Sequence, residues 1–500
     1  MADAPEMVFG FNYSIQNPLR TSTIALLIFF VLYLVASGLY GITFHPLATV
    51  PGPKLCGISR IPYWVACLKG QDVFWLHELH RQYGPVLRFG PQDLSYAANE
   101  WKPIYGLGKN KRENEKAQEF FIAPINEVPS MLSADYESHS RVRRLLAPAF
   151  SERSLKKQQV LIKKYADLLI STLAERSEDK ALVEMTSLFN FTTFDIMAEF
   201  CFGYSLGQLE TNDYIPWVRA IFEQLRTLPF MSIILYYPVL TTTLKNLKPK
   251  WITQKRIEHC QFAIDIVNRR LQEGSPSGDD LWALAGRGLS LQEMYSNAEF
   301  FMLAGSETSA TLLSGAVFYL LKNPITLKRL AAEVRGHFRS TEDMTFENLA
   351  KLPYLNASIK EVMRIFPVVA VGSPRVVPEG GQNISGMWLP EGTRISVHHY
   401  SVYHSELNFK HPEKFAPERW LGDSVYAKDN RDAHQPFSYG PRDCLGQAFA
   451  RHEIRLILAT LICAFDLKLG EESKDWDKTL RCYALWEKRK IYCHLTKIEE

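Results

Sequence analysis

Closely spaced cysteine pairs and long basic runs are both missing from this 500-residue chain. Its eight cysteines are scattered, with no C-x-x-C pair and no spacing typical of a zinc site. A disulfide framework is therefore not expected, and a reducing compartment is favoured. The 57 lysines and arginines barely outnumber the 54 aspartates and glutamates, so the charge gives no indication of nucleic-acid binding.

A long hydrophobic run is present near the N-terminus. Residues 21–44 carry no charge, and a helix of this length extends about 36 Å, enough to cross a hydrocarbon core of about 30 Å. The alternative is a signal peptide, whose apolar region is usually about 7 to 15 residues long. We therefore predict a single transmembrane anchor at 21–44, a luminal segment at 1–20, a proline-rich hinge at 45–55 and one large domain at 56–500.

The charges that flank the anchor favour a cytosolic location for the large domain. Lys54, Arg60 and Lys69 follow the run, and positive residues tend to stay on the cytoplasmic side. Arg20, before the run, argues for the opposite orientation. The balance predicts a single-pass protein of the endoplasmic reticulum membrane.

Helical periodicity dominates the large domain and predicts a mainly α fold with a small β region. Strands are expected at 85–90 and 94–99. The charged stretch 109–119 is expected to be a solvated loop or helix face. The apolar stretch 228–240 is too short to cross a bilayer, and two alternatives remain open: a core segment or a surface element that dips into the membrane.

The longest predicted helix runs from Leu291 to Lys322, opened by a capping box at Ser290 and Glu293. The polar segment AGSETS, 304–309, interrupts its apolar pattern. Buried polar groups need partners, so this polar centre indicates a functional cavity.

One cysteine stands in an unusual setting, the segment FSYGPRDCLG near the C-terminus. A buried core cysteine is the simplest alternative. The pattern F-x-x-G-x-R-x-C-x-G, however, is the haem-binding signature of the cytochrome P450 superfamily, and its five fixed positions recur by chance with a probability on the order of 10⁻⁴. The chain resembles this family at Phe437, Gly440, Arg442, Cys444 and Gly446.

Three further family motifs occur in the family's order. They are A-G-x-E-T at Ala304–Thr308, E-x-x-R at Glu361 and Arg364, and P-E-R at Pro417–Arg419. The resemblance covers everything after the anchor and implies the cytochrome P450 fold plus one N-terminal transmembrane helix. The stretches PERWLGD and HSRVRRLLAPAFS also resemble fungal secondary-metabolism members, such as isotrichodermin hydroxylases.

The resemblance implies that Cys444 is the axial ligand of haem b (iron protoporphyrin IX). A thiolate ligand pushes electron density onto iron and favours O–O cleavage. Gly440 and Gly446 would let the loop wrap the sulfur, and Phe437 would shield it. Four residues would bind the haem propionates: Arg442, Arg375, Arg143 and His139, which replaces the tryptophan usual in the family.

On the other side of the haem, the resemblance assigns proton delivery to Thr308 and Glu307. The alternative for Thr308 is a packing role, with its hydroxyl bonded to a carbonyl one turn earlier. Glu361, Arg364 and Arg419 would form a buried structural charge triad. By family position, the substrate pocket would be lined by Phe301, Ala304, Val369, Ala370, Val371, Gly372, Leu485 and Trp486.

The implied reaction is monooxygenation, in which RH, O₂, two electrons and two protons give ROH and H₂O. The apolar pocket suggests a hydrophobic small molecule, a terpenoid or polyketide-derived metabolite. The chain shows no G-x-G-x-x-G fingerprint, so NADPH-cytochrome P450 reductase is the expected electron donor, with a b-type cytochrome as an optional further donor. The rivals are a peroxide isomerase or dehydratase of the same fold and a non-catalytic haem sensor.

Overall fold

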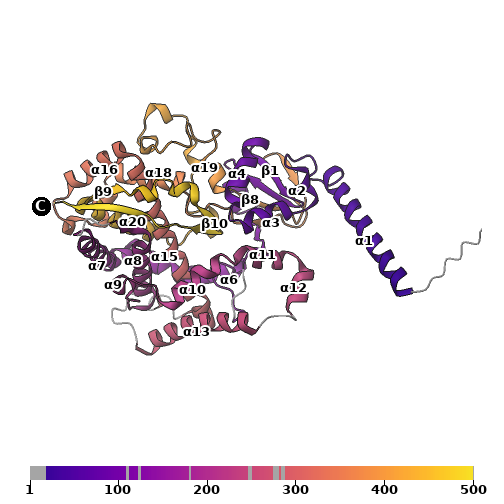
Figure 1. Cartoon of the computed structure of the whole chain (residues 1–500), viewed down its shortest axis with the longest axis horizontal. Coiled ribbons are helices and arrows are strands. Elements are labelled where there is room, and N and C mark those ends of the chain that lie inside the picture. The colour runs from indigo at the N-terminus through magenta and orange to yellow at the C-terminus, as the bar shows by residue number, and fades with distance from the viewer. Residues whose placement is uncertain are drawn as a thin grey trace, which may run out of the picture.

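Helix α1 (Pro18–Thr43) projects from the rest of the molecule in the computed structural model, which describes residues 18–108, 112–121, 126–178, 182–245, 250–273, 281–282 and 288–498 (Figure 1). Within these ranges it is the single helix long and apolar enough to cross a membrane, from Ser22 to Thr43. Its side chains from Ser22 onward are nearly all exposed. This exposed apolar helix is compatible with membrane anchoring.

The base of α1 is fastened to the domain by one arginine. Arg88, on strand β1 (Val86–Gly90), donates to the carbonyl oxygen of Gly41 at 2.7 Å and to that of Leu47 at 3.2 Å. The side chains of Leu47 and Val50 are buried in the domain core. The segment 45–55, expected to be a hinge, is therefore packed against the sheet rather than free.

Five strands form the largest sheet, in the order β1, β2 (Asp93–Tyr96), β8 (Arg394–Val397), β5 (Arg375–Val376) and β3 (Glu115–Lys116). The pair β2–β8 is parallel and the other pairs are antiparallel. The register of β3 and β5 places Lys116 opposite Arg375. The described smaller sheets are β4 (Val183–Glu184) with β12 (Tyr492–Lys497) and β9 (Phe465–Leu469), β10 (Arg481–Tyr483) with β11 (Leu485–Glu487), and β6 (Gln382–Ile384) with β7 (Met387–Leu389).

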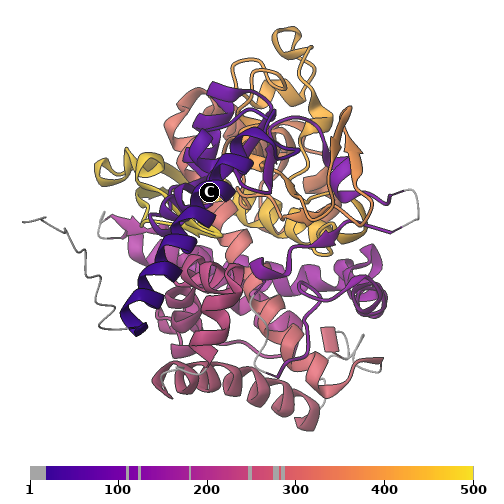
Figure 2. The same ribbon diagram turned by 90° about the vertical axis from the view of Figure 1, so that its right-hand side faces the viewer.

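Helices make up the rest of the domain and surround α15 (Leu291–Lys322), which runs through its middle (Figure 1, Figure 2). The bounds and the capping box of this helix confirm the sequence prediction. It packs against α8 (Met185–Phe202), α13 (Lys250–Glu273), α16 (Pro324–His337), α18 (Pro353–Ile365) and α20 (Gln447–Ala464). The other α-helices whose bounds lie within the described residues are α2 (Lys54–Ile58), α3 (Ile61–Leu68), α4 (Asp72–Tyr83), α5 (Trp101–Tyr105), α6 (Tyr136–Leu146), α7 (Glu152–Ser177), α9 (Gln208–Thr211), α10 (Pro216–Leu225), α11 (Leu228–Tyr236), α12 (Pro238–Lys245), α17 (Phe346–Ala350) and α19 (His399–Tyr403).

The structure distinguishes two open alternatives and corrects one expectation. The apolar stretch 228–240 is a surface element and not a core segment: it forms α11 and the start of α12, with Phe230 and Val239 exposed. Residues 109–111 of the charged stretch 109–119 lie outside the described residues, and residues 112–119 are not simply solvated, because Glu113, Asn114 and Lys116 are buried. Tertiary contacts decide which side chains are covered in both stretches, and a local charge or apolar pattern does not contain them.

Candidate functional site

Cys444 lies in a tight loop that leads into α20. The Cys444 backbone N–H donates to the Phe437 carbonyl at 2.8 Å and closes this loop. Gly440 adopts a φ of 82°, and a Cβ there would lie 2.1 Å from the carbonyl oxygen of Tyr105 on α5. A side chain at Gly440 is thus excluded, and the glycine lets the loop press against α5.

The Cys444 side chain is exposed, although protein atoms surround the loop. Burial raises the pKa of its thiol, while the Gly446 backbone N–H and the Arg143 guanidinium act in the opposite direction. At Gly446 a Cβ would approach only Phe150, at 3.8 Å, so no protein atom crowds this position. The loop therefore presents an accessible sulfur and a glycine that no protein atom crowds.

Basic side chains gather around a buried histidine, His139 of α6. Burial, together with the nearby Arg442, Lys116, Arg143 and Arg375, lowers the pKa of His139 to about 3. Its Nδ1 atom is buried without a hydrogen-bond partner. The lowered pKa keeps His139 neutral, and the four basic neighbours make the electrostatic potential around it positive.

The basic cluster, formed by Arg442, Arg143, Arg375 and Lys116, contains more basic side chains than carboxylate partners. Arg442 pairs with Glu113, and Arg143 pairs with Asp443. Arg375 donates to the Ser373 hydroxyl at 2.8 Å, Lys116 donates to the Leu132 carbonyl, and neither pairs with a carboxylate among the described residues. Burial and the neighbouring arginines lower the pKa of Lys116 to about 6. Lys116 and Arg375 are thus two basic groups without a carboxylate partner, and an anion beside Lys116 would raise its pKa and favour its charged form.

The polar centre of α15 has a buried side and an accessible side. Ser306 and Glu307 are buried, whereas Ala304 and Thr308 are partly exposed. The Thr308 hydroxyl donates to the Ala304 carbonyl at 2.6 Å, the bond that the packing alternative requires. The partly exposed position of Thr308 also leaves its oxygen available to a molecule beside the helix.

Comparison with known proteins agrees with this geometry. The model of the family described as Cytochrome P450 matches residues 59–494, which include the Cys444 loop and α15. The chain belongs to the cytochrome P450 family. It is 42% identical over 490 residues to the cytochrome P450 monooxygenase efuB of Hormonema carpetanum, covering 96% of both chains. It is also 40% identical to the monooxygenase lcsI of Purpureocillium lilacinum, covering 94% of this chain and 93% of lcsI.

A third relative carries a more specific name. The averantin hydroxylase of Dothistroma septosporum is 38% identical over 477 residues, covering 93% of this chain and 89% of the relative. The relatives are fungal, and the first two are named monooxygenases. The chain is therefore a member of the cytochrome P450 monooxygenases, whose family chemistry requires haem iron, a redox partner and a hydrophobic substrate.

The site residues fit a haem. An accessible sulfur supplies a thiolate ligand, and no protein atom crowds Gly446, where a flat group could approach. The two basic side chains without a carboxylate partner, Arg375 and Lys116, match the two propionates that a haem carries, and a propionate beside Lys116 would favour its charged form. Sequence reasoning missed Lys116, because this residue lies in a charged stretch that was expected to be solvated. Only the pairing of β3 with β5 brings it beside Arg375.

The structure brings Glu361, Arg364 and Arg419 together with no exposure of their side chains. Arg364 donates to both carboxylate oxygens of Glu361, at 3.0 and 2.8 Å, and the Arg419 Nε donates to Glu361 Oε1 at 3.0 Å. Asp429, which sequence reasoning missed, pairs with Arg419. The cluster ties α18 to the segment that precedes the Cys444 loop.

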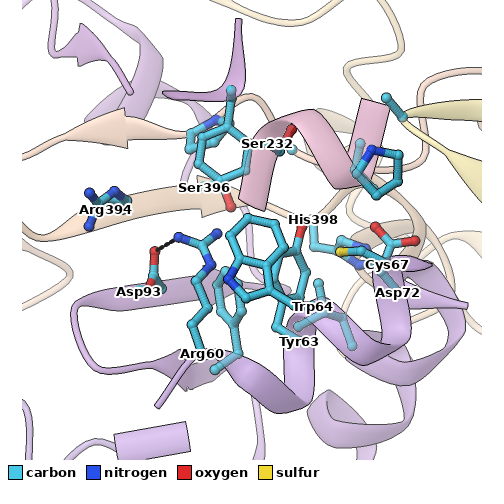
Figure 3. A pocket seen from close by; sticks show the side chains of 18 of the residues that line it. Arg60, Tyr63, Trp64, Cys67, Asp72, Asp93, Ser232, Arg394, Ser396 and His398 are labelled. Atoms are coloured by element: carbon cyan, nitrogen blue, oxygen red, sulfur yellow. Dashed lines mark hydrogen bonds and ion pairs between the residues drawn. The ribbon is translucent and has the colours of Figure 1, made fainter. Parts of the chain in front are cut away.

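The residues expected to line the substrate pocket fall into three groups. Val371 and Gly372 border a cavity of about 120 Å³ that also involves Arg60, Trp64 and Asp93 (Figure 3). Arg60 points at Asp93 there, and their ion pair measures 2.6 Å. In contrast, three of the expected residues pack in the core: Phe301, Ala370 and Trp486, whose indole N–H donates to the Pro367 carbonyl at 2.8 Å. The rest of the set is partly or fully exposed: Ala304, Val369 and Leu485.

Sequence reasoning also missed two contacts in which a residue of α15 pairs with a distant residue and one member is a buried glutamate. Glu307 pairs with Lys488, and the Ser309 hydroxyl donates to Glu453 of α20. Burial raises the pKa of Glu453 to about 8, and the Ser309 bond opposes this rise. Nothing in the local sequence indicates either pair, because 181 and 144 residues separate their members.

Proposed function

We propose that this chain is a haem-thiolate monooxygenase that inserts one oxygen atom from O₂ into a hydrophobic small molecule. The carrying observation is the accessible Cys444 sulfur beside a basic cluster in which two basic side chains have no carboxylate partner among the residues that the structure describes. A bound haem b supplies oxygen activation, and a thiolate ligand favours O–O cleavage.

Each site residue then has a defined task. Cys444 ligates the iron, and its loop is held by Gly440 and the Cys444 N–H bond to Phe437. Four basic side chains bind the propionates beside the neutral His139: Arg442, Arg375, Arg143 and Lys116. Thr308 and Glu307 move protons toward the site of oxygen activation, and Glu361, Arg364 and Arg419 hold the fold.

The partners and the location follow from the reaction and the anchor. NADPH-cytochrome P450 reductase supplies the electrons, and the substrate is a terpenoid or polyketide-derived secondary metabolite. Helix α1 anchors the protein in the endoplasmic reticulum membrane, with residues 56–500 as a cytosolic catalytic domain. The sequon at the exposed Asn383 therefore stays free of glycan, which peptide mass spectrometry of the native protein checks.

A spectral experiment tests the ligand assignment. The reduced protein with carbon monoxide should absorb at the red-shifted position typical of thiolate-bound haem. Cys444→Ala should abolish this band, while Cys463→Ala, at a partly buried cysteine on α20, should leave it unchanged. A band that persists in Cys444→Ala would show that another residue ligates the iron.

A kinetic experiment separates the monooxygenase from the peroxide isomerase rival. The wild-type protein should consume NADPH and O₂ only when the reductase is present. Metabolites that accumulate in a deletion strain, identified by mass spectrometry, supply the substrate for this assay. Turnover of that substrate without reductase or NADPH would favour the isomerase.

A further inference from the structure

The cavity of about 120 Å³ in Figure 3 is lined by side chains from α3, α4, α11 and the large sheet. Helix α11 lines it with Ser232, while Phe230 of the same helix is exposed on the surface. Pro374 lines it as well and directly precedes Arg375 of the basic cluster. The cavity is therefore bordered by a surface helix and by the chain segment that leads to a haem-site residue.

Aromatic and aliphatic side chains form much of the wall of this cavity. They are Tyr63, Leu76, Phe89, Leu94, Phe120 and Leu228. The volume of about 120 Å³ is close to that of an apolar protein cavity that binds benzene, about 150 Å³. The cavity is thus large enough for one aromatic ring or for a few water molecules.

Three buried side chains on this wall have hydrogen-bonding capacity that the protein leaves unused. Trp64, Asp72 and His398 line the cavity and are at most 5% exposed (Figure 3). Within the part of the chain that the structure describes, Trp64 Nε1, Asp72 Oδ1 and His398 Nε2 have no hydrogen-bond partner. Unsatisfied buried polar atoms cost free energy, so a bound molecule or ordered water is expected beside them.

The protonation states of these groups decide what they can bind. His398 Nδ1 accepts the Ser401 backbone N–H at 3.3 Å, and burial holds the pKa of His398 well below its ordinary value. The neutral ring therefore carries its proton on Nε2, which is a donor like the Trp64 indole N–H. Burial raises the pKa of Asp72 to about 7, and its ionised carboxylate is an acceptor. Two donors and one acceptor thus belong to the wall of one cavity.

The arginines of the wall already have carboxylate partners, which disfavours an anionic ligand. Arg60 pairs with Asp93 at 2.6 Å, and Arg394 pairs with Glu119. Neither guanidinium is left for a carboxylate or phosphate, and the two N–H donors disfavour an ammonium group. A hydroxyl group fits better, because it donates one hydrogen bond and accepts others.

We propose that this cavity binds a hydroxyl-bearing aromatic ring of the substrate. The ring packs against the apolar wall, while its hydroxyl donates to Asp72 and accepts from the Trp64 or His398 N–H. The inference rests on the proposed monooxygenase function and narrows its substrate to a neutral phenolic compound. A polyketide-derived metabolite is then favoured over a terpenoid hydrocarbon.

Phenol and toluene, which differ only by hydroxyl against methyl, test this chemistry with the haem-loaded, full-length protein. Saturation-transfer NMR titrations should show tighter binding of phenol, although toluene is the more hydrophobic probe. Trp64→Phe keeps an aromatic ring and removes the N–H donor. The affinity for phenol should therefore fall about five- to tenfold, while the affinity for toluene stays the same. Asp72→Asn, which replaces a charged acceptor by a neutral one, should also weaken phenol binding.

Trp388→Phe, at a tryptophan of β7 that is 61% exposed, is the matched control and should change neither affinity. A toluene affinity equal to or higher than that of phenol would overturn the proposal. The same holds for a phenol affinity that both Trp64→Phe and Asp72→Asn leave unchanged. Binding of neither probe would show that the cavity holds water only, which also overturns the proposal.

Turnover assays connect the cavity to the substrate. With the metabolite that accumulates in the deletion strain, Trp64→Phe should raise KM about five- to tenfold, and Trp388→Phe should not. An unchanged KM together with weakened phenol binding would refute the assignment of the cavity to the substrate. If wild-type protein oxidises no NADPH with the reductase, the proposed function fails instead, and the phenol–toluene comparison still decides what the cavity binds.

Discussion

Substitution of Arg364 by methionine removes the centre of the buried ionic cluster while keeping a side chain of similar length. Arg364 donates to Glu361 twice and to the carbonyl oxygens of Tyr403, Pro412 and Lys414 at 2.8, 2.7 and 3.1 Å. The change therefore takes partners from one carboxylate and three backbone acceptors. All of them lie in the segment that leads from α18 to the Cys444 loop.

The expected loss of stability follows from these contacts. Breaking a buried ion pair costs about 3 to 5 kcal/mol, and the lower value applies because Arg419 still pairs with Glu361. The Tyr403 and Pro412 carbonyls lose their side-chain donor at about 1 kcal/mol each, whereas the Lys414 carbonyl keeps a hydrogen bond from Arg419 at 3.4 Å. The total of about 5 kcal/mol is comparable with the whole free energy of unfolding of a typical domain, about 5 to 15 kcal/mol.

Denaturant unfolding of the haem-loaded protein, followed by circular dichroism, measures this loss. Arg329→Met is the matched control, because Arg329 also pairs with a glutamate of this region, Glu418, but its side chain is 57% exposed. An exposed pair contributes about 1 kcal/mol or less. If Arg364→Met does not accumulate as folded protein, Arg364→Lys, which keeps the charge, should give an intermediate loss. Equal losses for Arg364→Met and Arg329→Met would refute the stabilising role of the cluster.

Three further predictions concern individual residues. Thr308→Ala should keep the thiolate spectrum and NADPH oxidation, while product per NADPH falls about 10²-fold and hydrogen peroxide rises; an unchanged ratio would leave Thr308 only its bond to Ala304. Gly440→Ala should lower the free energy of unfolding by about 2 kcal/mol or more, because a β-carbon would meet the Tyr105 carbonyl in a left-handed conformation. Gly446→Ala, with its nearest protein atom at 3.8 Å, should leave that energy unchanged but weaken haem retention, and equal effects of both changes on unfolding would contradict this. Glu453 has a pKa of about 8 in the folded protein, above its ordinary 4.5, so between these values it keeps a proton that the unfolded chain releases. The free energy of unfolding should therefore fall between about pH 4.5 and 8 and level off above. Denaturant unfolding at a series of pH values should show a smaller fall in Glu453→Gln.

The features that could be predicted from the sequence are those that depend on residues close together in the chain. The helix Leu291–Lys322 carries its own capping box and apolar period, so both of its ends could be found. The Cys444 loop could be found because glycine, arginine and cysteine stand at fixed short spacings. The ionic cluster of Glu361 and Arg364 was accessible for the same reason, since i and i+3 residues share a helix face.

The features that escaped prediction depend on contacts between distant segments. Lys116 joins the basic cluster only through the pairing of two-residue strands, and its charged neighbours suggested a solvated loop. Lys488 reaches Glu307 because backbone hydrogen bonds from Trp476 and Thr186 fix the segment after β11. The hydrogen bond from the Trp486 indole N–H to the Pro367 carbonyl likewise joins segments that are far apart in the sequence.

The hydrogen bonds from Arg88 to the base of α1 restrict the orientation of the domain relative to this helix. Because the Gly41 and Leu47 carbonyls are both held by this guanidinium, the direction of the apolar helix is coupled to the edge of the large sheet. A bilayer around α1 would therefore fix the tilt of the whole body, not only tether it. Encounters with a second membrane-bound protein would become a two-dimensional search with a limited range of orientations. Arg88→Ala would widen that range and leave the catalytic residues in place.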